Sequence, residues 1–346
     1  MFSTRDRTID TLRGLAVFTM VAANGGAEVL AEPHPLWFRF YGSFAAPLFI
    51  LISGMMVALT RQTKGHRLKY FVVRGMMIII VGALEDVLIW RIYPFMTVDV
   101  LYLIGISLPL AYLFLHLAGL SRWIIVLSLF AVTPVLQKIL GYTDYPTEID
   151  LWGEQTVMVV NQTNVFNHWV VDGWFPIFPW VGFSLLGVNL AHLRWKSQPC
   201  TPSGRGSTLL IGMSTLVLGG LIWGFYPGRL LIREGYSELF YPPTIGYVMS
   251  SVGLIIVLFS IVDWRPSVVI YEPLLALGES ALFMYIGHLA FIVYVIVPLW
   301  PEEDFQTFLV TYFTLSFFLI LMGFGLRTLK TRWKDRPFVM RVLFGS

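Results

Sequence analysis

Four polar residues interrupt an otherwise apolar stretch over residues 9–30: Asp10, Arg13, Asn24 and Glu28. At the rotation per residue of an α-helix they fall within about 60° of one another, so they form one polar stripe along the whole stretch. Such a stripe is costly against lipid, and an ionisable residue inside a membrane span is by default a functional hypothesis. The stripe therefore predicts a helix that faces a protein interior or a water-filled cavity. The alternative is a structural polar contact within a helix bundle.

A histidine follows the polar stripe. The stretch ends in Asn24-Gly25-Gly26, and His34 then stands between two prolines at the expected membrane surface. Imidazole has an unperturbed pKa that suits proton transfer near neutral pH, so His34 can serve as a general base or as a nucleophile. The alternative is a solvated loop residue.

Composition indicates the elements that must position these residues. The chain has 346 residues, of which 56% are hydrophobic, 16% aromatic and only 13% charged. This is typical of a polytopic membrane protein, and we expect an all-α bundle forming a single transmembrane domain over residues 1–346. We do not expect the first span to be a cleaved signal peptide, because Arg13 interrupts it. Apolar runs of about 20 residues predict ten spans, at 9–30, 36–60, 69–91, 99–119, 122–140, 174–193, 208–226, 244–262, 275–299 and 305–328.

The distribution of Lys and Arg predicts the orientation of the spans. Most of them fall in the segments on the same side as the N-terminus, whereas the opposite loops collect Asp and Glu. By the positive-inside rule, both termini should be cytoplasmic and His34 should face outward. The inner basic belt also accounts for the net charge of +3, so nucleic acid is not an expected partner.

Other sequence signals are weaker. A lone cysteine, Cys200, excludes an intrachain disulfide, and no His, Cys, Asp or Glu grouping has metal-ligand spacing. Asn161-Gln162-Thr163 matches a glycosylation acceptor, a common pattern. The longest stretch outside the predicted spans, residues 141–173, can cover the outer mouth of a cavity.

Six motifs occur in order along the chain. They are RTIDTLRGLAV with NGG within residues 7–26, PLFILISG at 47–54, DVL with IG within 99–105, FPIFPWVG with LG within 175–187, YPPT at 241–244, and LG, AL, Y and H within 277–288. Together they resemble the heparan-alpha-glucosaminide N-acetyltransferase catalytic family, part of a transmembrane acyltransferase superfamily with many bacterial relatives.

The resemblance implies acyl transfer across a membrane. The donor would be cytoplasmic acyl-CoA, taken here as acetyl-CoA, and the acceptor an amino or hydroxyl group of a sugar or glycan on the outer face. His34 matches the catalytic histidine of the family and Asn24 its active-site asparagine. The chain departs from the family at Ser43, four positions before Pro47, where an acidic residue is often found. This departure bears on acceptor recognition.

Each candidate residue has an expected role. Asn24 can donate its amide N–H to the developing thioester oxyanion. The three phosphate groups of CoA favour basic residues at the inner ends of the spans, which selects Arg13, Lys69 and Arg74, with Arg13 first because it shares the stripe with Asn24. The alternative for each is ordinary positive-inside topology. Further cavity candidates are Asp10, Glu28, Asp99 and His288.

Two questions stay open at this point. His288 lies near the middle of the ninth predicted span, where a cavity role and a hydrogen bond between helices are equally consistent with the sequence. The alternative to an enzyme is a secondary transporter or flippase whose polar stripe lines a permeation path. The expected partners are acyl-CoA, a glycan acceptor and membrane lipid, with a homodimer left open. A bacterial inner membrane is the expected location, and no metal is expected.

Overall fold

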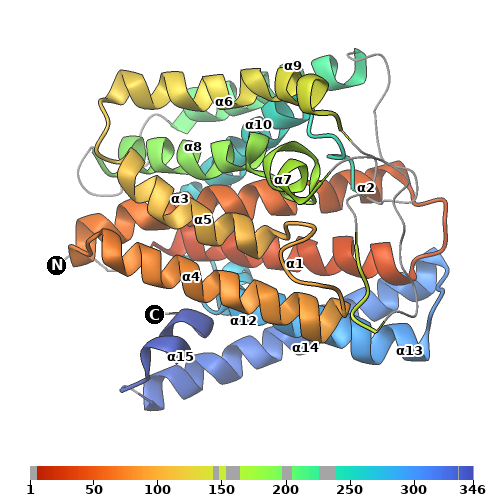
Figure 1. The fold of residues 1–346 in the computed structure, drawn as a ribbon. Helices are drawn as coiled ribbons and strands as arrows, with labels where there is room; N and C mark the ends of the chain where they lie inside the picture. The colour runs from red at the N-terminus through yellow and green to blue at the C-terminus, as the bar shows by residue number, and fades with distance from the viewer. Residues whose placement is uncertain are drawn as a thin grey trace.

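A computed structural model describes residues 6–142, 148–152, 164–196, 205–225, 238–333 and 335–345. Within these ranges the chain is helical, and its extended pairing is confined to two isolated bridges, Leu30 with Glu303 and Ile92 with Asp150. The long helices run roughly side by side, and the two chain ends lie at the same end of the bundle (Figure 1). Cys200 and the Asn161-Gln162-Thr163 triplet lie outside the described residues, as does much of the 141–173 segment.

The elements follow one another along the chain with short connections. They are α1 (Arg7–Val29), α2 (Leu36–Ser43), α3 (Ala45–Lys64), α4 (Leu68–Glu85), the π-helical turn η1 (Asp86–Trp90), α5 (Val100–Phe114), α6 (Gly119–Leu140), α7 (Val165–Asn167), η2 (His168–Asp172), α8 (Ile177–Lys196), α9 (Arg205–Phe225), α10 (Ile245–Trp264), η3 (Val269–Tyr271), α11 (Glu272–Gly278), α12 (Ala281–Phe291), η4 (Ile292–Ile296), α13 (Val297–Leu299), α14 (Phe305–Arg332) and α15 (Phe338–Leu343).

The helices are those of an integral membrane protein. Among the described residues, six are long and apolar enough to cross a membrane, or seven if the pair Val165–Asp172 and Ile177–Trp195, bent by 47°, is one span. The ten ranges predicted from the sequence each overlap a helix or a run of helical segments. Three of them do not reach that test for physical reasons. Two of these helices, α1 and α4, carry charges, and α5 has only 15 residues.

Helix α1 lies inside the bundle and packs against α11, α3, α12 and α14. Its approach to α11 is so close that only glycine fits. A Cβ added at Gly14 would lie 1.8 Å from the Leu274 carbonyl oxygen, and one at Gly278 would lie 1.8 Å from that of Asp10. Helices α6, α9 and α14, by contrast, expose many large apolar side chains, such as Leu120 and Val310. The polar stripe therefore runs through the interior while the periphery suits lipid.

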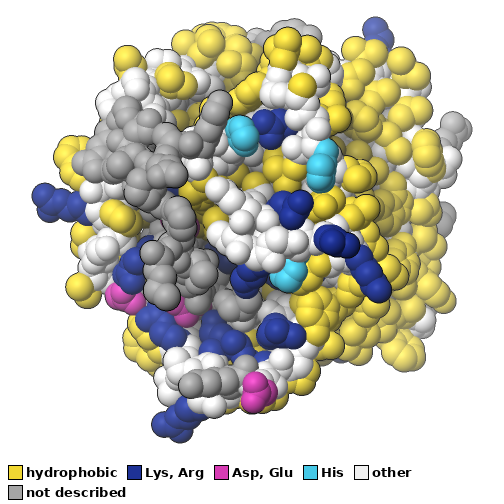
Figure 2. Space-filling view, turned by 90° about the vertical axis from the view of Figure 1, so that its left-hand side faces the viewer, with side chains coloured by type: hydrophobic (Ala, Val, Ile, Leu, Met, Phe, Trp, Pro, Cys, Tyr) yellow, Lys and Arg dark blue, Asp and Glu magenta, His cyan; other side chains and the backbone are white. Residues whose placement is uncertain are grey.

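The end of the bundle that holds both chain termini is rich in basic side chains. Figure 2 views this end and shows far more Lys and Arg than Asp and Glu. Arg61, Lys64, Arg67 and Lys69, around the turn between α3 and α4, are exposed. Acidic residues here are tied to bases, as when Arg194 bonds both Asp6, the N-cap of α1, and Asp263 of α10.

Candidate active site

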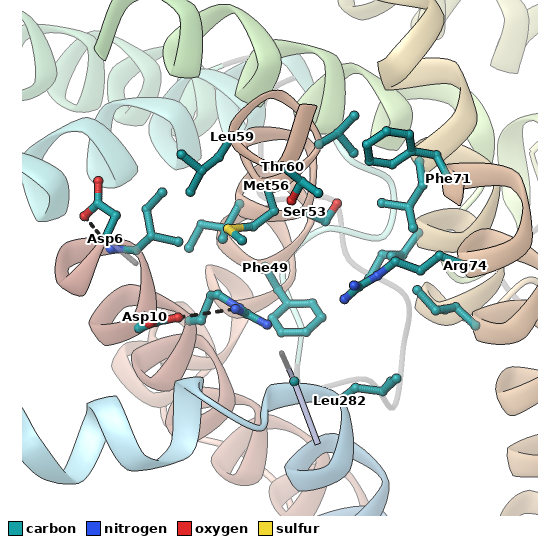
Figure 3. A pocket seen from close by; sticks show the side chains of 18 of the residues that line it. Asp6, Asp10, Phe49, Ser53, Met56, Leu59, Thr60, Phe71, Arg74 and Leu282 are labelled. Carbon is teal, nitrogen blue, oxygen red and sulfur yellow. Dashed lines mark hydrogen bonds and ion pairs between the residues drawn. The ribbon is translucent and has the colours of Figure 1, made fainter. Parts of the chain in front are cut away.

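A cavity of about 140 Å³ opens at the basic end of the bundle. Its walls come from α1, α3, α4, α5 and α12. In Figure 3, Arg74 reaches from α4 toward the middle of the cavity, and the dashed line at Asp10 marks its bond to Arg13. We call this space the inner cavity. Its polar lining is Asp6, Asp10, Arg13, Ser53, Thr60, Thr63, Lys64, Tyr70, Arg74 and Glu279.

The basic residues of the inner cavity stand on different walls. Arg13 Nη1 lies 3.4 Å from Asp10 Oδ1 on α1, and Arg74 Nη1 donates to the Tyr70 hydroxyl at 3.2 Å on α4. Lys64 comes from the end of α3. Guanidinium and ammonium groups converging from three helices can bind a polyphosphate from several sides.

Two of the three basic residues selected from the sequence thus line one cavity, and the third does not. Lys69 is exposed and lies outside the lining, whereas Lys64, which the sequence analysis did not select, lies within it. Lys64 shares a face of α3 with Phe49, Ser53 and Thr60 at helical spacing. Extending that face along α3 would have found it.

A second cavity, of about 330 Å³, lies toward the other end of α1, and we call it the outer cavity. Its aromatic wall includes Trp90, Trp174, Tyr241 and Tyr285. Five carboxylates also line it, and no described residue of its lining is Lys or Arg. These carboxylates belong to Glu28, Asp86, Asp99, Glu148 and Glu238. Burial raises the pKa of the Glu148 carboxyl, which the hydrogen bond from the Trp174 indole N–H at 2.9 Å partly offsets.

Asn24 is held in place by His288 from α12. His288 is fully buried, and its Nδ1 lies 3.1 Å from the Met284 carbonyl oxygen, which can only accept, so Nδ1 carries the proton. Its Nε2 then accepts from Asn24 Nδ2 at 2.9 Å. This bond orients the Asn24 amide and leaves its second N–H and its carbonyl oxygen for the cavity that Asn24 lines. For His288, the structure shows the hydrogen bond between helices.

A cluster of carboxylates and tyrosines lies behind one wall of the outer cavity. The Tyr285 hydroxyl lies 3.3 Å from both Glu85 Oε1 and Asp99 Oδ1. Tyr102 donates to Asp86 Oδ2 at 2.5 Å. Glu85 and Asp86, at the junction of α4 with η1, are 2% and 1% exposed. The sequence analysis selected neither, although two adjacent acids inside an apolar run were a usable signal.

His34 does not line either cavity. It is half-buried, in the connection between α1 and α2, and its Nε2–H donates to the Leu30 carbonyl oxygen at 2.8 Å. Because a carbonyl cannot donate, the neutral ring keeps its lone pair on Nδ1. Ser43, at the departure from the family pattern, is buried. It donates to the Arg39 carbonyl and accepts from the Leu239 backbone N–H.

All four residues of the polar stripe line a cavity. Asp10 and Arg13 line the inner one, and Asn24 and Glu28 the outer one. The two linings come within about one helical turn of each other. Ala46 of α3 lines the outer cavity and Phe49 the inner one, and the adjacent Val100 and Leu101 of α5 are divided in the same way.

Comparison with known proteins adds one match. A family model described as heparan-alpha-glucosaminide N-acetyltransferase, catalytic, matches residues 5–219, more than half of the chain. The matched range includes Arg13, Asn24, His34 and Arg74 and ends within α9. No curated protein matches the chain.

Proposed function

The chain belongs to the heparan-alpha-glucosaminide N-acetyltransferase catalytic family, and on that premise we propose that it moves an acetyl group across a membrane. The donor is cytoplasmic acetyl-CoA, and the acceptor is an amino or hydroxyl group of a sugar or glycan on the outer face. We place the protein in a bacterial inner membrane, with ten spans and both termini in the cytoplasm. The basic end of the bundle, where both chain ends lie, supports this orientation.

The observation that carries the proposal is the pair of cavities of opposite charge along α1. Arg13, Lys64 and Arg74 in the inner cavity suit the phosphates of CoA, and Asn24 in the outer cavity suits the reacting thioester. From Arg13 to Asn24 the helix rises about 16 Å. The pantetheine arm of CoA is the part of the donor that would bridge this interval, through the thin wall at Phe49.

The proposed chemistry uses one histidine and one asparagine. The acceptor atom attacks the thioester carbonyl carbon, the C–S bond breaks and CoA leaves as its thiolate. The proton of the acceptor passes to His34 Nδ1, or else Nδ1 first takes the acetyl group and then yields it to the acceptor. The free N–H of Asn24 donates to the oxyanion that forms on the carbonyl oxygen.

Label transfer tests the proposal. Purified protein is incubated with acetyl-CoA labelled in the acetyl group and with glucosamine, and the products are separated. Labelled N-acetylglucosamine supports acetyl transfer. Absence of labelled sugar from a preparation that binds both acetyl-CoA and glucosamine contradicts it.

Arg13→Ala and Arg74→Ala are expected to raise the KM for acetyl-CoA with little change in kcat. A phosphate contact that is equal in the ground and transition states affects binding alone. The loss of one charge-assisted contact costs about 1.5–3 kcal/mol, or a rise in KM of roughly 10- to 150-fold. Steady-state kinetics on purified variants provides the measurement.

Lys69→Ala is the matched control, since Lys69 carries the same charge on the same helix as Arg74 but lies outside the cavity. Its KM should equal that of the parent. An equal or larger effect of Lys69→Ala would remove the inner cavity from consideration as the CoA site.

Reporter fusions should place both chain ends and the α3–α4 turn in the cytoplasm. Green fluorescent protein joined after Gly65 or after Ser346 should fluoresce, and alkaline phosphatase joined after Ile149 should be active, because the basic segments stay inside. An active phosphatase after Ser346 would reverse the topology and put His34 on the side opposite to the acceptor.

A further inference from the structure

The outer cavity carries more negative charge than acetyl transfer by itself requires. Its lining holds five carboxylates, and its described residues include neither Lys nor Arg. Carboxylates grouped in a partly enclosed space repel one another, attract cations and exclude anions. The charge of the cavity therefore restricts which molecules can enter it.

Asp86 adds an independent observation, an unsatisfied oxygen at the cavity wall. Its side chain is 1% exposed and lines the cavity. Oδ2 accepts from Tyr102, but Oδ1 has no hydrogen-bond partner among the described residues. A buried carboxylate oxygen without a donor is costly and rare in folded proteins. Oδ1 therefore fits a donor that arrives with a ligand.

The neighbouring groups cannot supply that donor. The hydroxyl of Tyr102 is directed to Oδ2 of Asp86. Tyr285 has one hydroxyl proton, and Glu85 and Asp99 both lie 3.3 Å from its oxygen. Glu85 Oε2 also has no partner within the described part of the chain. Acceptor atoms thus outnumber donors around this wall.

The wall owes its charge to a local change of helix type. Residues adjacent in an α-helix point about 100° apart, so Glu85 and Asp86 would not ordinarily both face the interior. Here α4 passes into the π-helical turn η1 at Asp86, and both side chains are buried. π-helical turns are costly and are found frequently at functional sites.

We infer that Asp86, with Asp99 and the other carboxylates of the outer cavity, forms a subsite for an ammonium-bearing sugar that lacks sulfate and carboxylate groups. This inference rests on the proposed function and specifies its acceptor. An ammonium group offers three N–H donors and a positive charge, which suit Asp86 Oδ1 and its acidic surroundings. A neutral sugar leaves the charge unbalanced, and a sulfated or uronic acid sugar adds repulsion.

Binding of three related sugars to the parent protein is the first test. Glucosamine, N-acetylglucosamine and glucosamine 6-sulfate are titrated into purified protein without acetyl-CoA, by isothermal titration calorimetry at constant ionic strength. Glucosamine should bind at least about 10-fold more tightly than either of the others, since a charge-assisted contact is lost or opposed in both. Equal affinity for glucosamine 6-sulfate would overturn the subsite, as would equal affinity for N-acetylglucosamine.

Variants assign the effect to Asp86. Asp86→Asn keeps the size of the side chain and an oxygen for Tyr102, and it should weaken glucosamine binding about 10-fold or more while narrowing the discrimination against the 6-sulfate. Glu302→Gln removes an exposed carboxylate outside the cavity and should change neither value. Asp99→Asn is the second variant, because asparagine also caps a helix and α5 should keep its start. Unchanged glucosamine binding in folded Asp86→Asn would overturn the assignment.

Two further outcomes separate the subsite from the proposed function. Selective, Asp86-dependent binding of glucosamine without any acetyl transfer would uphold the subsite and contradict the transferase. Acetylation of glucosamine 6-sulfate as efficiently as glucosamine would uphold the transferase and contradict the subsite. Displacement of bound glucosamine by sodium but not by choline, at matched ionic strength, would indicate a site for a small metal cation and would also overturn the inference.

Discussion

His34→Ala is expected to slow acetyl transfer by about 10²–10⁴-fold if His34 acts as a general base, and to abolish it if His34 is an obligatory nucleophile. The histidine follows the Asn24-Gly25-Gly26 end of the polar stripe, and its ring keeps a lone pair on Nδ1 while Nε2–H is bonded to Leu30. The measurement is kcat on purified protein at saturating acetyl-CoA. The size of the defect distinguishes the two mechanisms.

The His34→Ala variant should fold and should bind acetyl-CoA as the parent does. A connection residue contributes little buried area, and such substitutions usually stay within about 0.5 kcal/mol. His116→Ala is the matched control, an exposed histidine of the α5–α6 connection that lines neither the inner nor the outer cavity. Transfer at the parent rate by folded His34→Ala would transfer the role of base to a carboxylate of the outer cavity.

Asn24→Ala should lower kcat by about 10²–10³-fold with the KM for acetyl-CoA nearly unchanged. The loss of one oxyanion donor has this size because the interaction strengthens only in the transition state. Asn24→Asp keeps the shape but replaces the N–H donors with oxygens, so it should lose as much activity. A drop in donor affinity without a drop in kcat would assign Asn24 to binding instead.

His288 acts through Asn24 and provides a graded check on the same prediction. His288→Ala removes the acceptor that orients the Asn24 amide, so kcat should fall while the KM for acetyl-CoA stays near the parent value. His288→Gln offers an amide oxygen to the same N–H and should retain more activity than His288→Ala. Equal losses in the two variants would mean that His288 only fills space in the core.

The sequence predicted the features that depend on local pattern. Helical periodicity predicted the polar stripe, and all four of its residues line cavities. Apolar runs predicted the helical ranges, because a run of that length is read within one element. Both depend on the spacing of residues along a single helix, which the sequence contains in full.

The features that escaped prediction depend on partners far away in the chain. His288 was compared with Glu279 on its own helix, whereas its partner Asn24 lies 264 positions away on α1. Glu85 and Asp86 meet the interior together only because of a π-helical turn, which α-helical spacing does not indicate. Lys69 and Lys64 have the same charge and nearly the same depth. Only the helix faces distinguish them.

Transfer between the two sides of a sealed membrane tests the central claim most directly. Proteoliposomes with the protein in one known orientation are loaded with glucosamine on the side of the outer cavity. Acetyl-labelled acetyl-CoA is then added only on the side of the inner cavity. The account predicts labelled N-acetylglucosamine inside the glucosamine compartment, with the signal lost in His34→Ala. Product that forms only when both substrates share one compartment, or unmodified glucosamine crossing the membrane, would contradict it.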